Sequence, residues 1–291
     1  MNDIYLQLRQ RARTIVAELP LPGFYSKFSE EITASEDLFA STPVLVRIKK
    51  KIIPMLENDF GHGVLHSVLV CRDAGAIVMI EMNNALTMKN TLSADISAYH
   101  KNCADQDIKK NMILVQIAGL LHDIKRKHKN HAQRGAEFAE KFLKTGYGLS
   151  EDDIYLICNA IREHEAFKQN SVNGNCTENN YKRDDNYAAE NGIFSNSCHD
   201  NAALLLSGAL YDADKFRWGP DNFTHTVWDM VMFSDTPFEE FKKRYPSGMA
   251  KLAEIKDTFR TSTGRKYGPE FIELGLKTGE SLAEFIKNQY T

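Results

Sequence analysis

The chain has 291 residues, of which 43% are hydrophobic, so it can bury a substantial core. Its 36 Lys and Arg residues against 39 Asp and Glu give a formal net charge of −3, which excludes a global attraction to bulk nucleic acid or to an anionic membrane. No window is long and apolar enough to span a bilayer, and the first residues lack the pattern of a signal peptide. We therefore expect a cytoplasmic protein that recognises phosphate, if at all, through local groups.

The five cysteines have no CxxC spacing, which favours reduced thiols in the cytoplasm. Three lie in apolar helical patterns, where we expect them to pack in the core: Cys71, Cys103 and Cys158. Cys176, Cys198 and His199 offer zinc ligands, but their separation is irregular and a fourth ligand is not apparent. The cysteines therefore predict packing rather than a metal site.

The distribution of proline predicts an all-α fold. All eight prolines lie outside the stretch from Met55 to Gly219, which favours uninterrupted helices there. We divide the chain into N-terminal helices (1–58), a central helical domain (59–220) and a C-terminal helical extension packed on the core (221–291).

The N-terminal part contains two predicted helices. The first spans residues 3–18 and ends before Pro20-Leu21-Pro22-Gly23. The second spans residues 41–58 and begins near Pro43, because proline suits the first turn of a helix.

The central domain begins with a long predicted helix over residues 66–86, followed by a polar and less regular passage over 89–105. A helix over 131–144 then stops at Gly146. The next helix starts at a capping box and carries one apolar stripe that ends in a histidine: Ser150 and Asp153, then Ile154, Ile157, Ile161 and His164.

Residues 168–200 are rich in Asn, Ser, Asp and Gly, which predicts a long surface insertion. The apolar run over 202–211 then predicts a buried helix that delivers Asp212 and Asp214. In the C-terminal extension we expect helical patterns separated by breaks at three places: Pro237, Pro246 and Gly268-Pro269.

The strongest chemical signal is His122-Asp123, which follows the apolar run over 113–121. An unpaired carboxylate in an apolar setting would neutralise or destabilise the fold. A divalent cation would satisfy both side chains, so the pair indicates a metal site.

Four short motifs occur in a fixed order along the chain: Gly61-His62-Gly63-Val64-Leu65-His66, Leu121-His122-Asp123, Ile161-Arg162-Glu163-His164 and Asp212-Ala213-Asp214-Lys215. In this order they resemble the HD domain superfamily of metal-dependent phosphohydrolases, over about residues 61–219. The resemblance implies an HD-domain helical bundle with helical extensions at both ends.

The resemblance also implies the metal ligands. One metal would be held by His66, His122, Asp123 and Asp214, and a second by His131 and His164, with Asp123 bridging. His131 follows Asp123 after eight residues, closer than in members with a Gly-Tyr-Pro signature, and the motif His131-Ala132-Gln133-Arg134-Gly135 is similar to the His-x-x-x-Gly pattern of the family. A packing role for His131, with a single metal, is the alternative.

The sequence leaves open which aspartate of Asp212-Ala213-Asp214 is the ligand and which metal is bound. Asp212 competes with Asp214, and the family pattern Ala-Asp-Lys favours Asp214, which leaves Asp212 to orient it or to cap a neighbour. Histidine and carboxylate ligands suit Fe, Mn, Co, Ni, Zn or Mg, and the sequence does not choose among them.

By the same resemblance, the protein would hydrolyse a nucleotide or other small phosphoester through a metal-activated water at Asp123. Lys125 and Arg126 follow the metal-binding pair, and Lys215 follows Asp214, so these cations are candidates to stabilise charge on the phosphoryl oxygens. His62 is the candidate general acid, on the face of His66 if that helix extends back.

Two other functions fit the same motifs. Some dinuclear iron members of the superfamily oxidise a polyol or phosphonate with dioxygen, and a non-catalytic sensor would bind metal and nucleotide without turnover. The partner expected in the leading case is a small phosphorylated substrate, and a homodimer stays open.

Overall fold

The computed structural model describes residues 2–56, 61–92, 98–166 and 195–290. These residues form helices and no strand, which confirms the all-α prediction. The helices of the N-terminal and central parts are α1 (Asn2–Ala17), α2 (Gly23–Lys27), α3 (Ser29–Ser41), α4 (Pro43–Ile52), the 3-10 turn η1 (Ile53–Met55), α5 (Val64–Leu92), α6 (Ala98–Leu121), α7 (His131–Leu143) and α8 (Glu151–Arg162). They are followed by α10 (Ser195–Phe216), the π-helical η2 (Asn222–Thr226), α11 (Val227–Phe233), α12 (Phe238–Ile255) and α13 (Ser262–Gln289).

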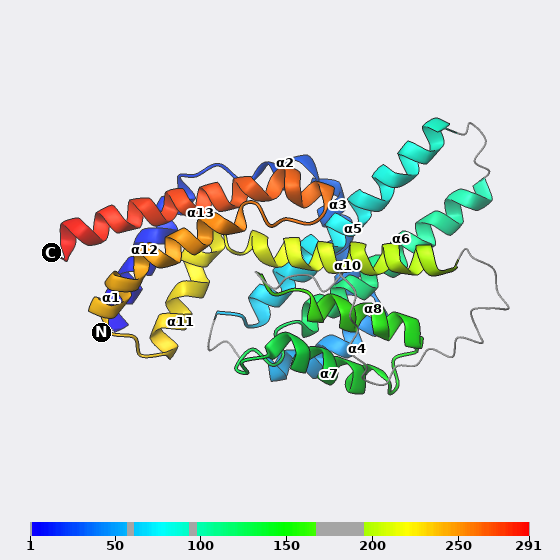
Figure 1. Ribbon diagram of the computed structural model, residues 1–291, viewed down its shortest axis with the longest axis horizontal. Helices are drawn as coiled ribbons and strands as arrows, with labels where there is room; N and C mark the ends of the chain where they lie inside the picture. The colour runs from blue at the N-terminus through cyan, green and yellow to red at the C-terminus, as the bar shows by residue number, and fades with distance from the viewer. Residues whose placement is uncertain (1, 57–60, 93–97, 167–194, 291) are drawn as a thin grey trace.

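The molecule is elongated, and the helices gather at its two ends (Figure 1). At one end α5, α6, α8 and α10 pack against one another, with α3, α4 and α7 on the outside. At the other end α1 packs against η2, α11 and α13, and both chain termini lie there. α10 joins the two ends because it contacts α5, α6, α8 and also α13.

The N-terminal part is more helical than the sequence predicted. α1 and the start of α4 at Pro43 agree with the prediction, whereas α2 and α3 fill the segment between them. The second predicted helix is shorter than 41–58, because regular α-helix ends at Ile52 and a 3-10 turn containing Pro54 follows. Residues 57 and 58 lie outside the described part.

The expected irregular passage over 89–105 is wrong for most of its length. α5 continues to Leu92 and α6 begins at Ala98, and these two helix ends project together from the body of the molecule (Figure 1). Polar composition does not break a helix here, because the passage also contains Ala, Leu and Lys, which form helices well. Cys103 lies in this projection and is exposed, so its expected core position is wrong, whereas Cys71 and Cys158 are buried.

Two expected breaks in the C-terminal extension are also wrong. Pro246 lies inside α12 and Pro269 inside α13, and the packing of these two helices against each other offsets the hydrogen bond that each proline removes. Gly268 does not end a helix either. It provides room for the ring of Phe259, which occupies the space that a Cβ would need. The break at Pro237 is confirmed, because α12 begins after it.

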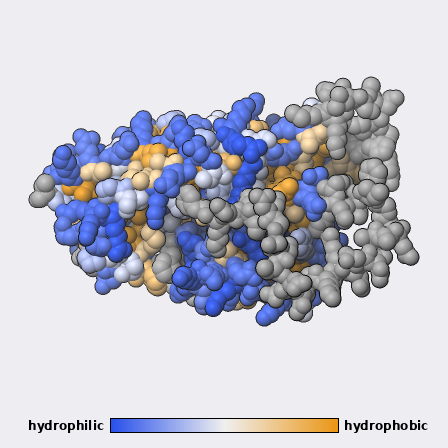
Figure 2. All heavy atoms as spheres, viewed as in Figure 1, coloured by the Kyte–Doolittle hydropathy of each residue, from blue (hydrophilic) through white to orange (hydrophobic). Residues whose placement is uncertain are grey.

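Most of the predicted insertion over 168–200 lies outside the described residues, together with Cys176 and the side chains of Cys198 and His199. Among the helices that the structure describes, none is long and apolar enough to cross a membrane. Hydrophilic residues predominate over the face shown in Figure 2, with hydrophobic patches between them.

A buried ionic network joins the end of α10 to α5 and α2. The guanidinium of Arg217 lies 2.5 Å from Asp73 Oδ2 and donates to the Tyr25 hydroxyl and to Asp221. The side chains of Arg217 and Asp73 are 4% and 0% exposed. Because removing one partner leaves a buried charge without its counter-charge, this network is a strong constraint on the fold.

We predict that Asp73→Asn lowers the free energy of unfolding by about 3–5 kcal/mol, since it removes the buried carboxylate beside Arg217 and leaves that guanidinium only the more exposed Asp221. Urea denaturation followed by circular dichroism measures the change. The control is Glu36→Gln, which removes an exposed partner of Arg72 and should cost less than about 1 kcal/mol. Equal effects of the two variants would contradict the role of the buried network.

Candidate metal centre

The predicted ligands come from different segments, and helix ends bring them together. His66 lies in the first turn of α5, and His122-Asp123 directly follows α6. His131 is the first residue of α7, His164 comes just after α8, and Asp214 lies in the last turn of α10. All six side chains are buried in one cluster.

One half of the cluster surrounds Asp123 Oδ2 and Asp214. The Nε2 atoms of His66 and His122 are 3.2 Å apart. Asp123 Oδ2 lies 3.2 Å from His122 Nε2 and 3.7 Å from His66 Nε2. Asp214 Oδ1 lies 3.3 Å from His66 Nε2 and 3.9 Å from His122 Nε2. Two imidazoles and two carboxylates therefore point at one small volume.

The other half surrounds Asp123 Oδ1. It lies 3.5 Å from His131 Nε2 and 3.6 Å from His164 Nε2, and these two nitrogens are 3.3 Å apart. Oδ1 is buried and accepts no hydrogen bond from any part of the chain that the structure describes. Such a carboxylate oxygen is costly unless a cation satisfies it. Asp123 thus stands between two histidine pairs, one at each oxygen.

Three groups of these side chains have their ligand atoms within 4.8 Å of one another and can hold a metal ion. Two of them are the halves just described: His66, His122 and Asp214, then Asp123, His131 and His164. The third consists of His62, His66 and Asp123. Imidazole nitrogen and carboxylate oxygen suit the divalent metals of the first transition row.

The outer nitrogens of three imidazoles are held by hydrogen bonds that leave Nε2 facing the cluster. His122 Nδ1 lies 2.7 Å from the carbonyl of Gly119, and His164 Nδ1 lies 2.7 Å from that of Ile161. A carbonyl can only accept, so each Nδ1 carries a proton and the neutral ring keeps its lone pair on Nε2. This is the tautomer that a metal requires.

Glu165 does the same for His131, with Oε1 3.0 Å from Nδ1. Sequence reasoning missed this residue, because its position directly after His164 does not show which imidazole it contacts. Gly135 also helps to place His131, because α7 approaches so closely that a Cβ on Gly135 would lie 3.2 Å from the carbonyl of His122. The His-x-x-x-Gly pattern thus has a steric reason in this fold.

The protonation of the cluster favours metal-binding forms at most positions. Burial lowers the pKa of His66 to about 4 and that of His131 to about 3, and it also lowers the pKa of His164. Burial alone would raise the pKa of Asp123, but the adjacent His122 and His62 hold it well below its ordinary value. For Asp214 the effect of burial is likewise outweighed, chiefly by Lys215.

His122 differs from the other imidazoles. Burial alone would lower its pKa, but the adjacent Asp123 carboxylate outweighs burial and raises it. The carboxylate therefore favours a second proton on His122, at Nε2. A metal would replace that proton, because metal binding to histidine releases it.

His62 reaches the cluster by a route other than the one expected. α5 begins at Val64, so His62 precedes the helix rather than continuing the face of His66. Its Nδ1 lies 2.9 Å from Asp123 Oδ2. Gly61 makes this possible, because it has a φ of +70° and the backbone of Thr226 leaves no room for a Cβ there. His62 is therefore placed either to hold a metal or to move a proton.

The three candidate cations have different positions. Arg126 points at the cluster, with Nη1 2.9 Å from His131 Nε2 and 3.7 Å from Asp123 Oδ1. Lys125 instead places its ammonium 4.8 Å from the centre of the Phe138 ring. Lys215 is buried, and its Nζ lies 2.5 Å from Asp214 Oδ2. Of the three, only Arg126 both faces the cluster and keeps a side chain that is 37% exposed.

Asp212 and Asp214 have separate tasks. Asp214 faces the histidines, whereas Asp212 accepts hydrogen bonds from the backbone of Arg260 and from the backbone and hydroxyl of Thr261, at 2.7–2.8 Å. Burial raises the pKa of Asp212 to about 6. Asp212 therefore secures the segment that starts α13, which is the capping alternative.

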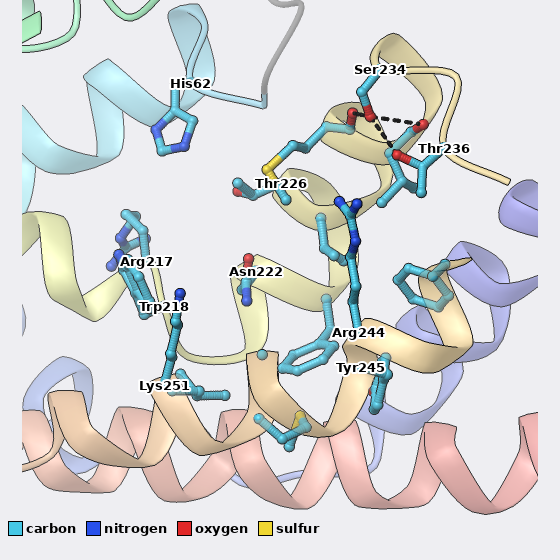
Figure 3. A pocket seen from close by; sticks show the side chains of 18 of the residues that line it. His62, Arg217, Trp218, Asn222, Thr226, Ser234, Thr236, Arg244, Tyr245 and Lys251 are labelled. Atoms are coloured by element: carbon cyan, nitrogen blue, oxygen red, sulfur yellow. Dashed lines mark hydrogen bonds between the residues drawn. The ribbon is translucent and has the colours of Figure 1, made fainter. Parts of the chain in front are cut away.

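Two pockets open onto the cluster and share His62 and Arg126. The larger has a volume of about 510 Å³ and extends between η2, α11 and α12 (Figure 3). The smaller, of about 340 Å³, lies along the segment 123–128 beside Met55 and Leu56. Small molecules can therefore reach the cluster from two sides.

We predict that protein purified without chelator carries about two metal ions per chain and that His131→Ala carries about one, because this substitution removes a ligand atom from one half only. Elemental analysis of both proteins measures the stoichiometry. About one metal in each would assign His131 to packing.

We also predict that Glu165→Gln weakens metal binding about 10- to 100-fold, because it removes the carboxylate that orients His131. Competition with a chromophoric chelator measures the affinity. Glu163→Gln is the matched control, since its side chain has no contact with the cluster among the described residues. Equal affinity of the two variants would show that Glu165 does not support the site.

No protein-family model matches this chain, and no curated protein or solved structure is significantly similar to it. The likeness to the HD domain superfamily therefore rests on the ordered motifs of the sequence and stays a prediction. The structure adds that the residues of those motifs form one buried cluster that can hold a metal ion.

Proposed function

We propose that this chain is a metal-dependent phosphohydrolase of the HD type, acting on a nucleotide or other small phosphoester. The observation that carries the proposal is the position of Asp123 between two buried histidine pairs, with Arg126 beside it and two pockets that meet there. The orphaned Oδ1 of Asp123 and the four imidazole nitrogens around this carboxylate fit a divalent ion.

Six residues would hold metal. His66, His122 and Asp214 form one half, His131 and His164 form the other, and Asp123 lies between them. A divalent ion at such a site lowers the pKa of water from 15.7 to about 7 and polarises phosphoryl oxygens.

Arg126 is the residue best placed to bind the phosphoryl group. Its guanidinium lies beside the cluster and remains accessible, and a guanidinium can contact two phosphoryl oxygens at once. Lys215 acts indirectly, through Asp214. It neutralises Asp214 and keeps that carboxylate aimed at His66, so we assign it a positioning role rather than contact with substrate.

His62 is placed to move a proton. Its side chain is 13% exposed, it lines both pockets, and it touches the carboxylate of Asp123. Imidazole is the commonest group for proton transfer in catalysis, and the oxygen of a departing alcohol needs a proton. This position supports the role of general acid suggested by the sequence.

A diiron oxygenase and a metal and nucleotide sensor use the same kind of cluster. The accessible Arg126 favours an anionic substrate but does not choose between hydrolysis and oxidation of one. Dioxygen uptake with iron would identify the oxygenase, and tight nucleotide binding without product would identify the sensor.

We predict that the protein releases phosphate from a phosphoester when it is loaded with one of the candidate metals, and that Asp123→Asn lowers kcat/KM at least about 100-fold. A panel of phosphoesters tested with Fe(II), Mn, Co, Ni, Zn and Mg measures this. The matched control is Asp107→Asn, an exposed residue of α6, which should keep full activity. Circular dichroism checks that both variants are folded. If no phosphoester is hydrolysed with any of these metals, the proposal is wrong.

A further inference from the structure

The larger pocket is lined by helices of the C-terminal extension and ends at the metal cluster. Figure 3 shows His62, Trp218 and Lys251 on one side of it and Ser234, Thr236 and Arg244 on the other, with Thr226 and Asn222 between. At about 510 Å³ it falls within the range of small-molecule sites. A substrate whose phosphate lies at Arg126 would therefore extend its other part into this pocket.

The walls of this pocket are mainly apolar. They come from η2, α11 and α12: Phe223, Val227, Met230, Val231, Phe241, Met249 and Leu252. The smaller pocket differs, because basic residues line it next to Asp123: Lys125, Arg126, Lys127 and His128. The two sides of the cluster thus suit the two ends of an amphiphilic molecule.

Several polar groups in the larger pocket are already used within the protein. The hydroxyl of Tyr245 donates to the carbonyl of Gly279, and the hydroxyls of Ser234 and Thr236 bond each other at 2.6 Å. Arg217 is committed to its buried network. Arg244 pairs with Glu240.

Beyond His62 and Arg126 at the cluster, four lining side chains carry further polar groups: Trp218, Asn222, Thr226 and Lys251. A nucleoside presents several donors and acceptors on its base and ribose, and each one buried without a partner costs binding energy. These few groups are spread along walls that are mainly apolar, so most donors and acceptors of a base and ribose would face hydrocarbon side chains. A hydrocarbon group has no such requirement and gains from contact with the apolar walls.

We propose that the substrate is a phosphoester of a hydrocarbon alcohol, alkyl or aryl, whose hydrocarbon group occupies the larger pocket. This inference rests on the proposed function and makes it more specific. In the reaction the oxygen of water bonds to phosphorus and the bond from phosphorus to the alcohol oxygen breaks. One proton of water passes to that oxygen, so the products are the free alcohol and inorganic phosphate.

The first test measures binding rather than turnover. Isothermal titration with butyl, hexyl, octyl and decyl phosphate should show affinity rising about threefold to fourfold per methylene until the pocket is full. The rise should be accompanied by a negative heat-capacity change. Phenyl and 2-naphthyl phosphate form the aryl arm, which distinguishes a preference for rings from one for chains. Adenosine monophosphate should bind more weakly than octyl phosphate.

Two variants locate the effect in the pocket. Met230→Gln should weaken octyl phosphate binding about tenfold and leave inorganic phosphate binding unchanged, whereas Met232→Gln, the same change on α11 outside the pocket, should alter neither. Val227→Trp should fill space, so that affinity stops rising at a shorter chain. Equal effects of the two methionine variants would overturn the assignment of the pocket.

Failure of this inference and of the proposed function would look different. Affinity independent of chain length, or tighter binding of adenosine monophosphate than of octyl phosphate, overturns the hydrocarbon site even if phosphate is released from both. Affinity that rises with chain length, without phosphate release from any ester under any metal, keeps the hydrocarbon-binding pocket and rejects the hydrolase.

Discussion

The buried charge of Asp123 is the constraint on which the central domain depends. A carboxylate that is almost fully enclosed must be balanced by neighbours, and here the neighbours are imidazoles from α5, α7 and the ends of α6 and α8. Each of these segments also contributes apolar residues to the same core. The packing of the helices and the electrostatics of the cluster therefore specify one arrangement, because a shift of any helix would separate Asp123 from a compensating group.

Much of the cluster could be predicted because histidine and aspartate are unusual at the end of an apolar helical segment. His122-Asp123 and His164 each follow a strong apolar helical pattern. Such a pattern indicates where the helix ends and therefore where these side chains lie. Glu165 could not be assigned in the same way, since an acidic residue beside a histidine has no fixed partner until α7 and α8 are packed. Lys215 shows the opposite case. Its charge was evident from the sequence, but its burial against Asp214 depends on the rings of Tyr211 and Trp218.

The larger pocket could not be predicted at all, and the reason is physical. Its walls consist of residues such as Val231 and Leu252, whose spacing on helices is the ordinary pattern of core packing. Whether such residues meet a neighbour or enclose a space depends on the angle between helices. Prolines were misleading for a related reason, because Pro246 and Pro269 lie in helices that tertiary packing maintains.

The end of α10 carries Asp214 and, three residues later, Arg217. Asp214 belongs to the metal cluster, and Arg217 donates hydrogen bonds to Tyr25 of α2 and Asp73 of α5. Asp214 in the last turn of α10 and Arg217 just past its end thus tie the N-terminal segment to the metal cluster. Loss of α2 would remove one partner of Arg217 and so weaken the positioning of Asp214. A chain shortened at its beginning would therefore keep every predicted ligand and still bind metal poorly.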